Sequence, residues 1–226
     1  MCEVGKFNFS ETLLAIIEED VPIFFQKGKI DVFIEDYYMT KLNILDIGTG
    51  DGRFIYKSAA LNPKNIYIGI EPSVNFKEYQ REINRKKLTN ATLINSSVEN
   101  FDSSDNFFDQ IFIHLPWGVL LKYVVTVDKD IFKKLSKMLK KGGELEIIFG
   151  YDPKLEHSET KRLELKELNL NELGFLKERY SKIPGLELKH FQLISNKDLK
   201  NKQTSWSKKL AFGGLRNFFQ INLVKK

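Results

Sequence analysis

The feature that most constrains this chain is an apolar segment that runs directly into three glycines at alternate positions. The segment covers residues 43–47, and Gly48, Gly50 and Gly52 follow it before a helical pattern begins. Glycines let the backbone turn tightly and leave no side chain between the backbone and a ligand. The free N–H groups at the start of the next helix then face the space that the glycines clear. This pattern predicts a nucleotide-type cofactor site at the carboxyl end of a first parallel strand.

A second landmark agrees with the first. An apolar segment at 66–70 ends in Glu71, about twenty residues after the glycines, where a doubly wound fold places an acid that binds ribose hydroxyls. The dinucleotide fingerprint reads G-x-G-x-x-G, whereas here Asp46 precedes glycines at every second position. This spacing resembles the first motif of class I S-adenosylmethionine (SAM) methyltransferases. Two alternatives stay open, namely NAD-type binding and a tight turn followed by a solvated glutamate.

Composition sets further limits on the class of protein. The chain has 226 residues, 42% hydrophobic content and a formal net charge of +5, so it fits one α/β domain with additions and is compatible with an anionic partner. The single cysteine, Cys2, excludes a disulfide framework and suits the cytoplasm. The three histidines show no ligand spacing, so no metal is expected. We also expect no membrane association, because no segment approaches the length of a membrane span.

Strand and helix patterns alternate along most of the chain. Residues 1–41 are interpreted as an N-terminal extension with a helix and a strand that could belong to a hairpin, and residues 42–226 as the main domain. The expected strands cover 43–47, 66–70, 91–95, 109–113, 144–149, 186–194 and 217–224. The expected helices cover 52–61, 73–87, 129–139 and 163–179, and a stop signal at 140–143 ends the third. The alternation predicts an α/β, Rossmann-like fold with a mostly parallel seven-stranded sheet and helices on both faces.

An aromatic turn at Pro116 and Trp117 follows the fourth predicted strand. The resemblance to class I enzymes puts this turn beside the methyl group of SAM, where adenine-modifying methyltransferases stack their base. Alone, Trp117 would be interpreted as a core residue. Trp206 changes this interpretation, because it lies in a basic segment with Lys208 and Lys209. Two indoles could sandwich a base taken out of its stack.

These elements together resemble the aminoglycoside-resistance 16S rRNA (adenine(1408)-N(1))-methyltransferases. The resemblance spans roughly residues 43 to 221 and is most selective at 115–118, at Trp206 and at 209–213, with Phe218 and Phe219. It implies methylation of N1 of adenosine 1408 in the decoding site of the small (30S) ribosomal subunit, with SAM as cofactor. The charge and bulk added to the base would obstruct aminoglycosides. We expect a cytoplasmic monomer whose last two strands are the antiparallel strands of methyltransferases.

The resemblance also implies roles for individual residues. Trp117 and Trp206 would sandwich the flipped adenine, and Pro116 would help to orient it. The residues that would frame SAM are Asp46, Gly48, Gly50, Asp51, Gly52, Arg53, Glu71, Pro72, Val98, Glu99, Leu115 and Thr204. Among these, Val98, Glu99 and Leu115 would line the adenine end, and Thr204 would lie near the methionine part.

Basic residues that flank the predicted pocket are candidate phosphate contacts, because RNA bound through its backbone needs a spread positive surface. They are Arg81, Arg85, Lys86, Lys87, Lys161, Arg162, Lys208, Lys209 and Arg216. The resemblance gives Arg216 a contact with the rRNA backbone near the target, whereas Gly214 stands where the family often has another basic residue. Each basic run alone could be a solvated surface.

Two other functions stay open from the residues alone. The chain could be a class I methyltransferase that acts on another RNA or on a small molecule, or a non-catalytic RNA-binding module. His114 is interpreted as a satisfied core residue, and Asp102, Asp105 and Asp109 as turn residues before the fourth strand.

Overall fold

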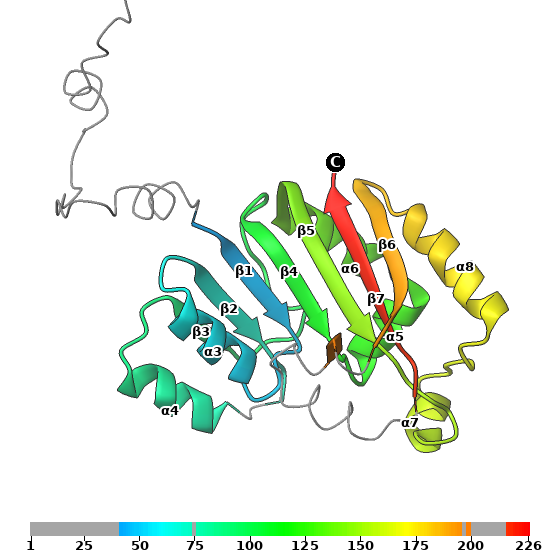
Figure 1. Cartoon of the computed structure of the whole chain (residues 1–226), viewed down its shortest axis with the longest axis horizontal. Helices are drawn as coiled ribbons and strands as arrows, with labels where there is room; N and C mark the ends of the chain where they lie inside the picture. Colours follow the sequence, from blue (N-terminus) through cyan, green and yellow to red (C-terminus); the bar gives the residue numbers. More distant parts are fainter. Residues whose placement is uncertain (1–40, 74–75, 196–197, 200–215) are drawn as a thin grey trace, which may run out of the picture. The chain divides into compact units, whose positions relative to one another are not determined.

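The computed structural model describes residues 41–73, 76–195, 198–199 and 216–226 (Figure 1). Contacts divide the chain into two compact units, Met1–Thr40 and Lys41–Lys226. The helix and strand predicted for the N-terminal extension lie outside the described residues. Within the described ranges, no helix is both long enough and apolar enough to cross a membrane.

A seven-stranded sheet forms the centre of the second unit, in the order β3-β2-β1-β4-β5-β7-β6. The strands are β1 Asn43–Ile47, β2 Ile66–Ile70, β3 Ala91–Ile94, β4 Phe108–His114, β5 Leu139–Phe149, β6 Leu186–Ile194 and β7 Phe218–Lys225. The first five strands pair in parallel. Strand β7 pairs antiparallel with both β5 and β6, so β6 runs in the same direction as the first five. Of the last two strands, both predicted to be antiparallel, only β7 runs against the others. The predicted mostly parallel sheet is confirmed.

Helices cover both faces of this sheet, with α3 and α4 on one side and α5 and α6 on the other (Figure 1). The helices are α3 Arg53–Leu61, α4 Lys77–Arg85, α5 Val119–Thr126, α6 Lys129–Met138, α7 His157–Arg162 and α8 Leu170–Ser181. The predicted helix at 73–87 is therefore shorter than expected, and α5 was not predicted.

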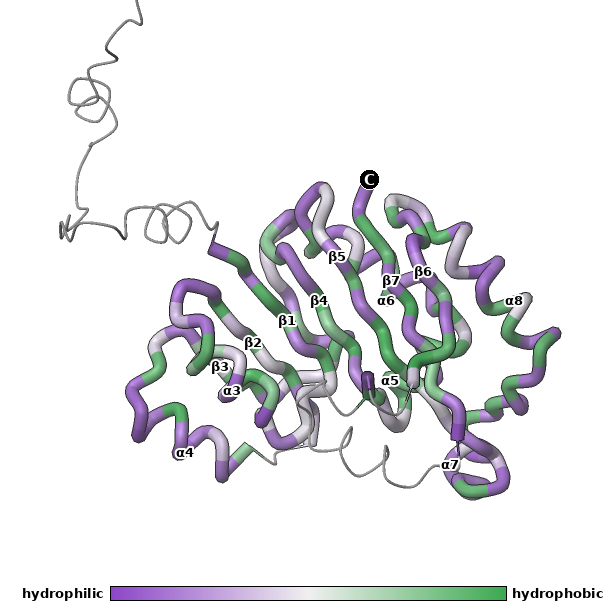
Figure 2. Tube along the Cα trace, viewed as in Figure 1, coloured by the Kyte–Doolittle hydropathy of each residue, from purple (hydrophilic) through white to green (hydrophobic). Residues whose placement is uncertain are grey.

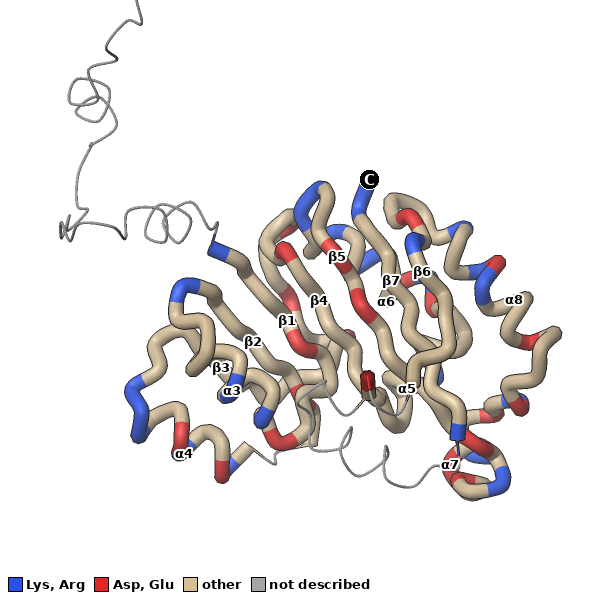
Figure 3. Tube along the Cα trace, in the orientation of Figure 1, with Lys and Arg blue, Asp and Glu red and all other residues tan. Residues whose placement is uncertain are grey.

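The core consists of apolar clusters on the two faces of the sheet. Ile44 belongs to the cluster that includes Ile55 of α3, whereas its neighbour Leu45 belongs to the cluster that includes Phe132 of α6. Alternate residues of a strand point to opposite faces, so β1 is buried on both sides, which explains its continuous apolar sequence. Hydrophobic residues follow the central strands (Figure 2), and charged residues gather on the outer helices and loops (Figure 3).

The predicted helix at 163–179 begins too early, because only α8 occupies this range, from residue 170 to residue 181, and α7 ends before it at residue 162. Helix α8 begins only after Asn169, whose side-chain oxygen accepts a hydrogen bond from the backbone N–H of Glu172 at 3.0 Å. Such an N-cap stabilises a helix start. Between the two helices, residues 163–164 form a turn and residues 165–169 have no regular secondary structure.

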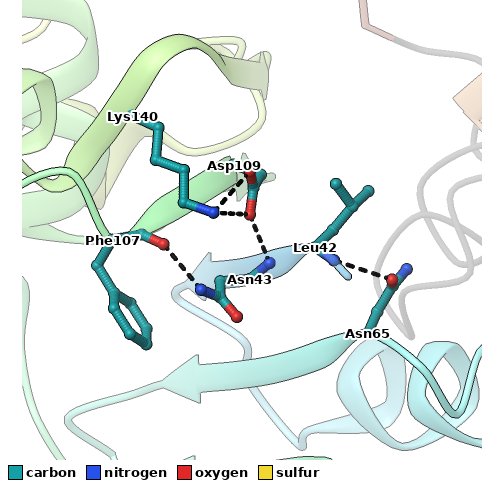
Figure 4. A network of polar contacts seen from close by, with 6 residues as sticks. All are labelled: Leu42, Asn43, Asn65, Phe107, Asp109 and Lys140. Atoms are coloured by element: carbon teal, nitrogen blue, oxygen red, sulfur yellow. Dashed lines mark hydrogen bonds and ion pairs between the residues drawn. The ribbon is translucent and has the colours of Figure 1, made fainter. Parts of the chain in front are cut away.

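The junction between α6 and β5 also differs from the prediction. Helix α6 ends at Met138, one residue before its predicted end, and residues 140–143 belong to β5 and not to a loop before it. Asp109, predicted to be a turn residue, lies in β4. Its Oδ2 accepts a hydrogen bond from the backbone N–H of Asn43 at 2.7 Å and lies 2.8 Å from Nζ of Lys140 (Figure 4). Asp109 thus joins the beginnings of three neighbouring strands.

We expect Asp109→Ala to lower the free energy of unfolding by about 1–3 kcal/mol, because the N–H of Asn43 and the ammonium group of Lys140 lose their shared partner. Urea denaturation followed by circular dichroism measures this change. Asp105→Ala in the nearby turn is the matched control, with an expected change within about 0.5 kcal/mol. Equal losses in the two variants would contradict the role given to Asp109.

Candidate functional site

A cavity of about 1060 Å³ opens at the carboxyl ends of the parallel strands. Its wall combines the glycine turn after β1, the residues that follow β2 and β3, and the aromatic turn after β4. The predicted site residues that line it are Asp46, Gly48, Gly50, Asp51, Glu71, Pro72, Val98, Glu99, Leu115, Pro116, Trp117, Arg162 and Arg216. The structure therefore brings together residues that lie as much as 170 positions apart in the sequence.

The glycine turn is shaped for close approach. Gly48 and Gly50 have φ angles of +77° and +60°, which strain any residue with a side chain. A Cβ atom on Gly48 would lie 2.9 Å from Cδ2 of Leu120, whereas nothing lies within 4 Å of the Cβ position of Gly50. The backbone at Gly50 is therefore open to the cavity.

Glu71 ties the glycine turn to the end of β2. Its Oε2 accepts a hydrogen bond from the backbone N–H of Gly50 at 3.3 Å, and its Oε1 accepts from the hydroxyl of Ser73 at 2.7 Å. The backbone N–H groups of Gly48 and Thr49 donate to the carbonyl of Ile70 at 2.9 and 3.1 Å. The carboxylate of Glu71 is thus held at the cavity wall.

Gly52 and Arg53 do not line the cavity, although both were predicted to frame SAM. Gly52 is the N-cap of α3 with a φ of +84°, and a Cβ there would lie 2.6 Å from Cδ1 of Leu93. The turn and its packing therefore explain this glycine. The backbone N–H of Arg53 donates to Oδ1 of Asp51 at 3.1 Å, which stabilises the first turn of α3.

Two buried polar side chains, those of Asp46 and His114, line the cavity next to the glycine turn. Asp46 is 3% exposed, and burial raises the pKa of its carboxyl group although the charge of His114 opposes this shift. Nε2 of His114 lies 2.6 Å from Oε1 of Glu146, whose Oε2 accepts from Gln220 at 2.7 Å. His114 is buried, as expected, but it lines the cavity and its buried Nδ1 has no hydrogen-bond partner among the described residues, so the prediction of a satisfied core residue is wrong.

The aromatic turn exposes its indole to the cavity. Trp117 is 55% exposed, so it does not fill the core. Leu115, two residues before Trp117, has a φ of +53°. This left-handed conformation costs a residue with a side chain about 1–2 kcal/mol. Its backbone N–H donates to the carbonyl of Ile148 at 2.7 Å, and its side chain packs on the cluster that contains Phe218. These contacts hold the strained turn that directs Trp117 outward.

Tyr123 of α5 is a cavity residue that the sequence analysis missed. Its hydroxyl donates to Oε1 of Glu99 at 2.7 Å, and this bond, together with partial burial, raises the pKa of Tyr123 to about 12. The apolar helical spacing of Leu121 and Val124 directly after Gly118 is the signal that could have revealed this helix.

Two of the predicted RNA-binding residues reach the cavity wall, and each is paired with a glutamate. Nη2 of Arg162 lies 2.7 Å from Oε1 of Glu159, and Arg216 pairs with Glu156. The backbone N–H of Asp152 donates to Oε2 of Glu156 at 2.8 Å, which fixes this carboxylate. The sequence analysis did not identify either glutamate.

The other predicted RNA-binding residues lie apart from the cavity or outside the described residues. Nη2 of Arg85 pairs with Glu82 at 2.6 Å, and Nζ of Lys86 lies 5.1 Å from the centre of the Tyr56 ring. Arg81, Lys87 and Lys161 are exposed. Of the residues that the sequence analysis singled out for the site, those outside the described ranges are Thr204, Trp206, Lys208, Lys209 and Gly214. Among the described residues, no group of three or more His, Cys, Asp or Glu side chains could hold a metal ion.

Comparison with known proteins identifies the family. The model of the 16S rRNA (adenine(1408)-N(1))-methyltransferase family, named NpmA, matches residues 27–224. The chain belongs to this family. The matched region begins inside the segment interpreted as an N-terminal extension.

Individual relatives agree with the family model. The chain is 32% identical over 187 residues to the 16S rRNA (adenine(1408)-N(1))-methyltransferase of Escherichia coli, which covers 79% of this chain and 84% of that protein. It is 32% identical to the 30S ribosomal A1408 methyltransferase of an uncultured bacterium, with a TM-score of 0.58. This match covers 89% of our chain and 96% of the other chain. A variant enzyme from Catenulisporales acidiphilia, solved with its cosubstrate SAM, shares the fold. It is 22% identical, with a TM-score of 0.67, and the match covers 86% of our chain and 90% of the other chain.

Proposed function

We infer that this methyltransferase transfers a methyl group from SAM to N1 of adenosine 1408 in 16S rRNA, a modification related to aminoglycoside resistance. The family match over residues 27–224 carries this conclusion. The exposed indole of Trp117 on the cavity wall agrees with it, because an enzyme that modifies a base needs a surface on which to stack that base.

The residues present fit SAM. The carboxylate of Glu71 is held at the end of β2, where an acid can accept hydrogen bonds from ribose hydroxyls. The open space beside Gly50 admits a ligand to the backbone of the turn. The cavity of about 1060 Å³ exceeds the size typical of small-molecule sites, and so has room for a base next to the cofactor.

SAM supplies a methyl group on a positively charged sulfur. The protein has to align this group with the ring nitrogen and exclude water, which can account for much of a rate enhancement. N1 of adenine has a free lone pair, so no side chain has to remove a proton before the attack. The bond from N1 to the methyl carbon forms as the carbon–sulfur bond breaks, which gives N1-methyladenosine and S-adenosylhomocysteine. Trp117 stacks the base, and the strained turn at Leu115 and Pro116 fixes its orientation.

The individual contacts with rRNA are part of the same proposal. Trp206 covers the second face of the base, and Thr204 lies near the methionine part of SAM. Arg162 and Arg216 bind phosphates at the cavity mouth, and their position on the cavity wall supports this role. The basic residues of α4 and of the segment around Lys208 extend the contact with the rRNA. The enzyme acts as a monomer in the cytoplasm, on the assembled 30S subunit. Residues 42–226 form the catalytic domain, and residues 1–41 an extension of it.

Primer extension on 16S rRNA tests the function. Small subunits are incubated with the protein and SAM, and reverse transcription is expected to stop at adenosine 1408, because a methyl group on N1 blocks base pairing. Subunits incubated without SAM are the control. The absence of a new stop with a protein that binds SAM would contradict the proposed substrate.

Trp206→Ala separates an rRNA enzyme from a small-molecule enzyme. We expect the variant to lose about 100-fold in the rate of rRNA methylation, because one stacking face and the alignment of the base are lost. Its Kd for SAM, measured by calorimetry, should stay within about twofold, since stacking on the target base does not contribute to cofactor binding. An unchanged methylation rate would contradict the sandwich of two indoles.

A further inference from the structure

His114 is a buried, titratable side chain of the cavity wall that the methyl transfer itself does not use. It is the last residue of β4, and Asp46 lies near the end of the neighbouring strand β1 (Figure 1). The two strands pair in parallel, with Asp46 opposite Phe112, and both Asp46 and His114 line the cavity. These two side chains therefore reach the cavity at the same edge of the sheet.

The imidazole of His114 is anchored at one nitrogen and open at the other. Nε2 lies 2.6 Å from Oε1 of Glu146 on β5, and Oε2 of Glu146 accepts a hydrogen bond from Gln220 on β7 at 2.7 Å. Because a carboxylate only accepts hydrogen bonds, the proton of the neutral ring stays on Nε2. Nδ1 is buried and has no partner among the described residues. A second proton therefore binds at Nδ1 while the ring keeps its place.

The charged side chains that interact with His114 come from neighbouring strands. Glu146 of β5 is bonded to the ring, and Asp46 of β1 interacts with its charge. Glu71, at the end of β2, interacts with Asp46 in turn. Two phenylalanine rings, from α3 and β4, pack on His114 and carry no charge. A proton on His114 thus adds one positive charge beside these carboxylates.

The reacting sulfur of the proposed complex lies near this edge of the sheet. The cofactor is held at the glycine turn, which begins two residues after Asp46, and the target base stacks on Trp117, three residues after His114. The methyl group passes between the two turns, and so the sulfur that carries it lies close to where they start. S-adenosylhomocysteine lacks this methyl group and has no charge on its sulfur. A charge on His114 therefore acts differently on SAM and on the product.

We propose that His114 is a specificity-determining residue that sets the affinity of the cavity for SAM relative to S-adenosylhomocysteine through the charge of its ring. A neutral ring leaves the carboxylates to stabilise the positively charged sulfur. A protonated ring places a like charge near that sulfur, which weakens binding of SAM and has less effect on the product. This inference rests on the proposed function, because it assigns the cavity to SAM. It goes further in predicting that the product inhibits more strongly as the pH falls.

Calorimetry with both ligands over a range of pH tests the inference. We expect the association constant of SAM, divided by that of S-adenosylhomocysteine, to fall about 5- to 20-fold from about pH 7.5 to about pH 5.5, where histidines gain their proton. His114→Gln should hold this ratio within about twofold over the same range, because the amide does not titrate. His190→Gln is the matched control, since His190 is exposed on β6 and does not line the cavity. It should keep the wild-type change.

A titration of the wild-type protein tests the same point without a substitution, and so decides it even where His114→Gln does not fold. The chain has three histidines, and the NMR signal of each ring reports its protonation. Coupling between two binding events is reciprocal, so a sulfur that is disfavoured by the proton also disfavours the proton. We expect His114 to gain its proton at a lower pH in the SAM complex than in the S-adenosylhomocysteine complex. His157 and His190 should titrate alike in both complexes.

The outcomes separate this inference from the proposed function. An equal pH dependence in the wild type and in His114→Gln would assign the effect to another group, such as Asp46, and would overturn the inference. Identical titration of His114 in the two complexes would overturn it as well. Both results leave the methyltransferase assignment intact, because both require that the ligands bind. A wild-type protein that binds neither ligand would contradict the proposed cofactor itself.

Discussion

Trp117→Ala is expected to lower kcat/KM for 16S rRNA methylation about 100-fold. The indole is 55% exposed on the cavity wall, so its removal takes away a stacking surface rather than core packing. Stacking of a base on an aromatic side chain contributes about 1–3 kcal/mol, and a base that is no longer aligned with the methyl group reacts more slowly. Steady-state transfer of labelled methyl groups to 30S subunits measures the effect.

Leu193→Ala is the matched control for this variant. Leu193 is another large apolar residue, 61% exposed, on β6 and away from the cavity wall. We expect its kcat/KM to stay within about twofold of the wild type, as is usual for surface substitutions. A loss of activity in Trp117→Ala together with a matching loss of SAM affinity would argue for damage to the cofactor site rather than for stacking.

Glu71→Ala has the second large expected effect, on cofactor binding. The carboxylate binds the ribose hydroxyls in the proposed site and also accepts a hydrogen bond from the N–H of Gly50. Each hydrogen bond to a charged group is worth about 1.5–3 kcal/mol, so the Kd for SAM should rise about 10- to 100-fold. Calorimetry on the purified protein measures this Kd directly.

Glu78→Ala serves as the control for Glu71→Ala. Glu78 is an exposed carboxylate in the first turn of α4 and does not line the cavity. Its removal changes the net charge by the same amount, so general electrostatic effects on SAM binding would appear equally in both variants. A Kd that rises equally in the two variants would show that Glu71 has no specific contact with the ribose.

Most strands could be predicted to within one residue, because their patterns are local, whereas β5 begins five residues before its predicted start. Strand β1 is buried on both faces, and a continuous apolar run followed by glycines is typical of such a strand. The tail was harder to predict because helix propensity extends across residues 163–179, whereas the cap at Asn169 decides where α8 begins. Helix α5 was missed because it follows the aromatic turn with no capping side chain to signal its start.

The site was partly predictable for a similar reason. Asp46, Gly48, Gly50 and Glu71 belong to motifs whose spacing is fixed by one strand–helix–strand unit, made of β1, α3 and β2, so their place on the cavity wall follows from sequence alone. Pairs such as Tyr123 with Glu99 and Arg216 with Glu156 join elements far apart in the chain. No local pattern reports such pairs, since tertiary packing creates them.

Nucleoside analysis of the modified subunit tests the central claim most directly. Purified 30S subunits are methylated with the protein and SAM, the rRNA fragment around position 1408 is isolated, and its nucleosides are identified by mass spectrometry against standards. The account predicts N1-methyladenosine in that fragment, approaching one methyl group per subunit. N6-methyladenosine at this position, or methylation confined to another nucleotide or to tRNA, would contradict it.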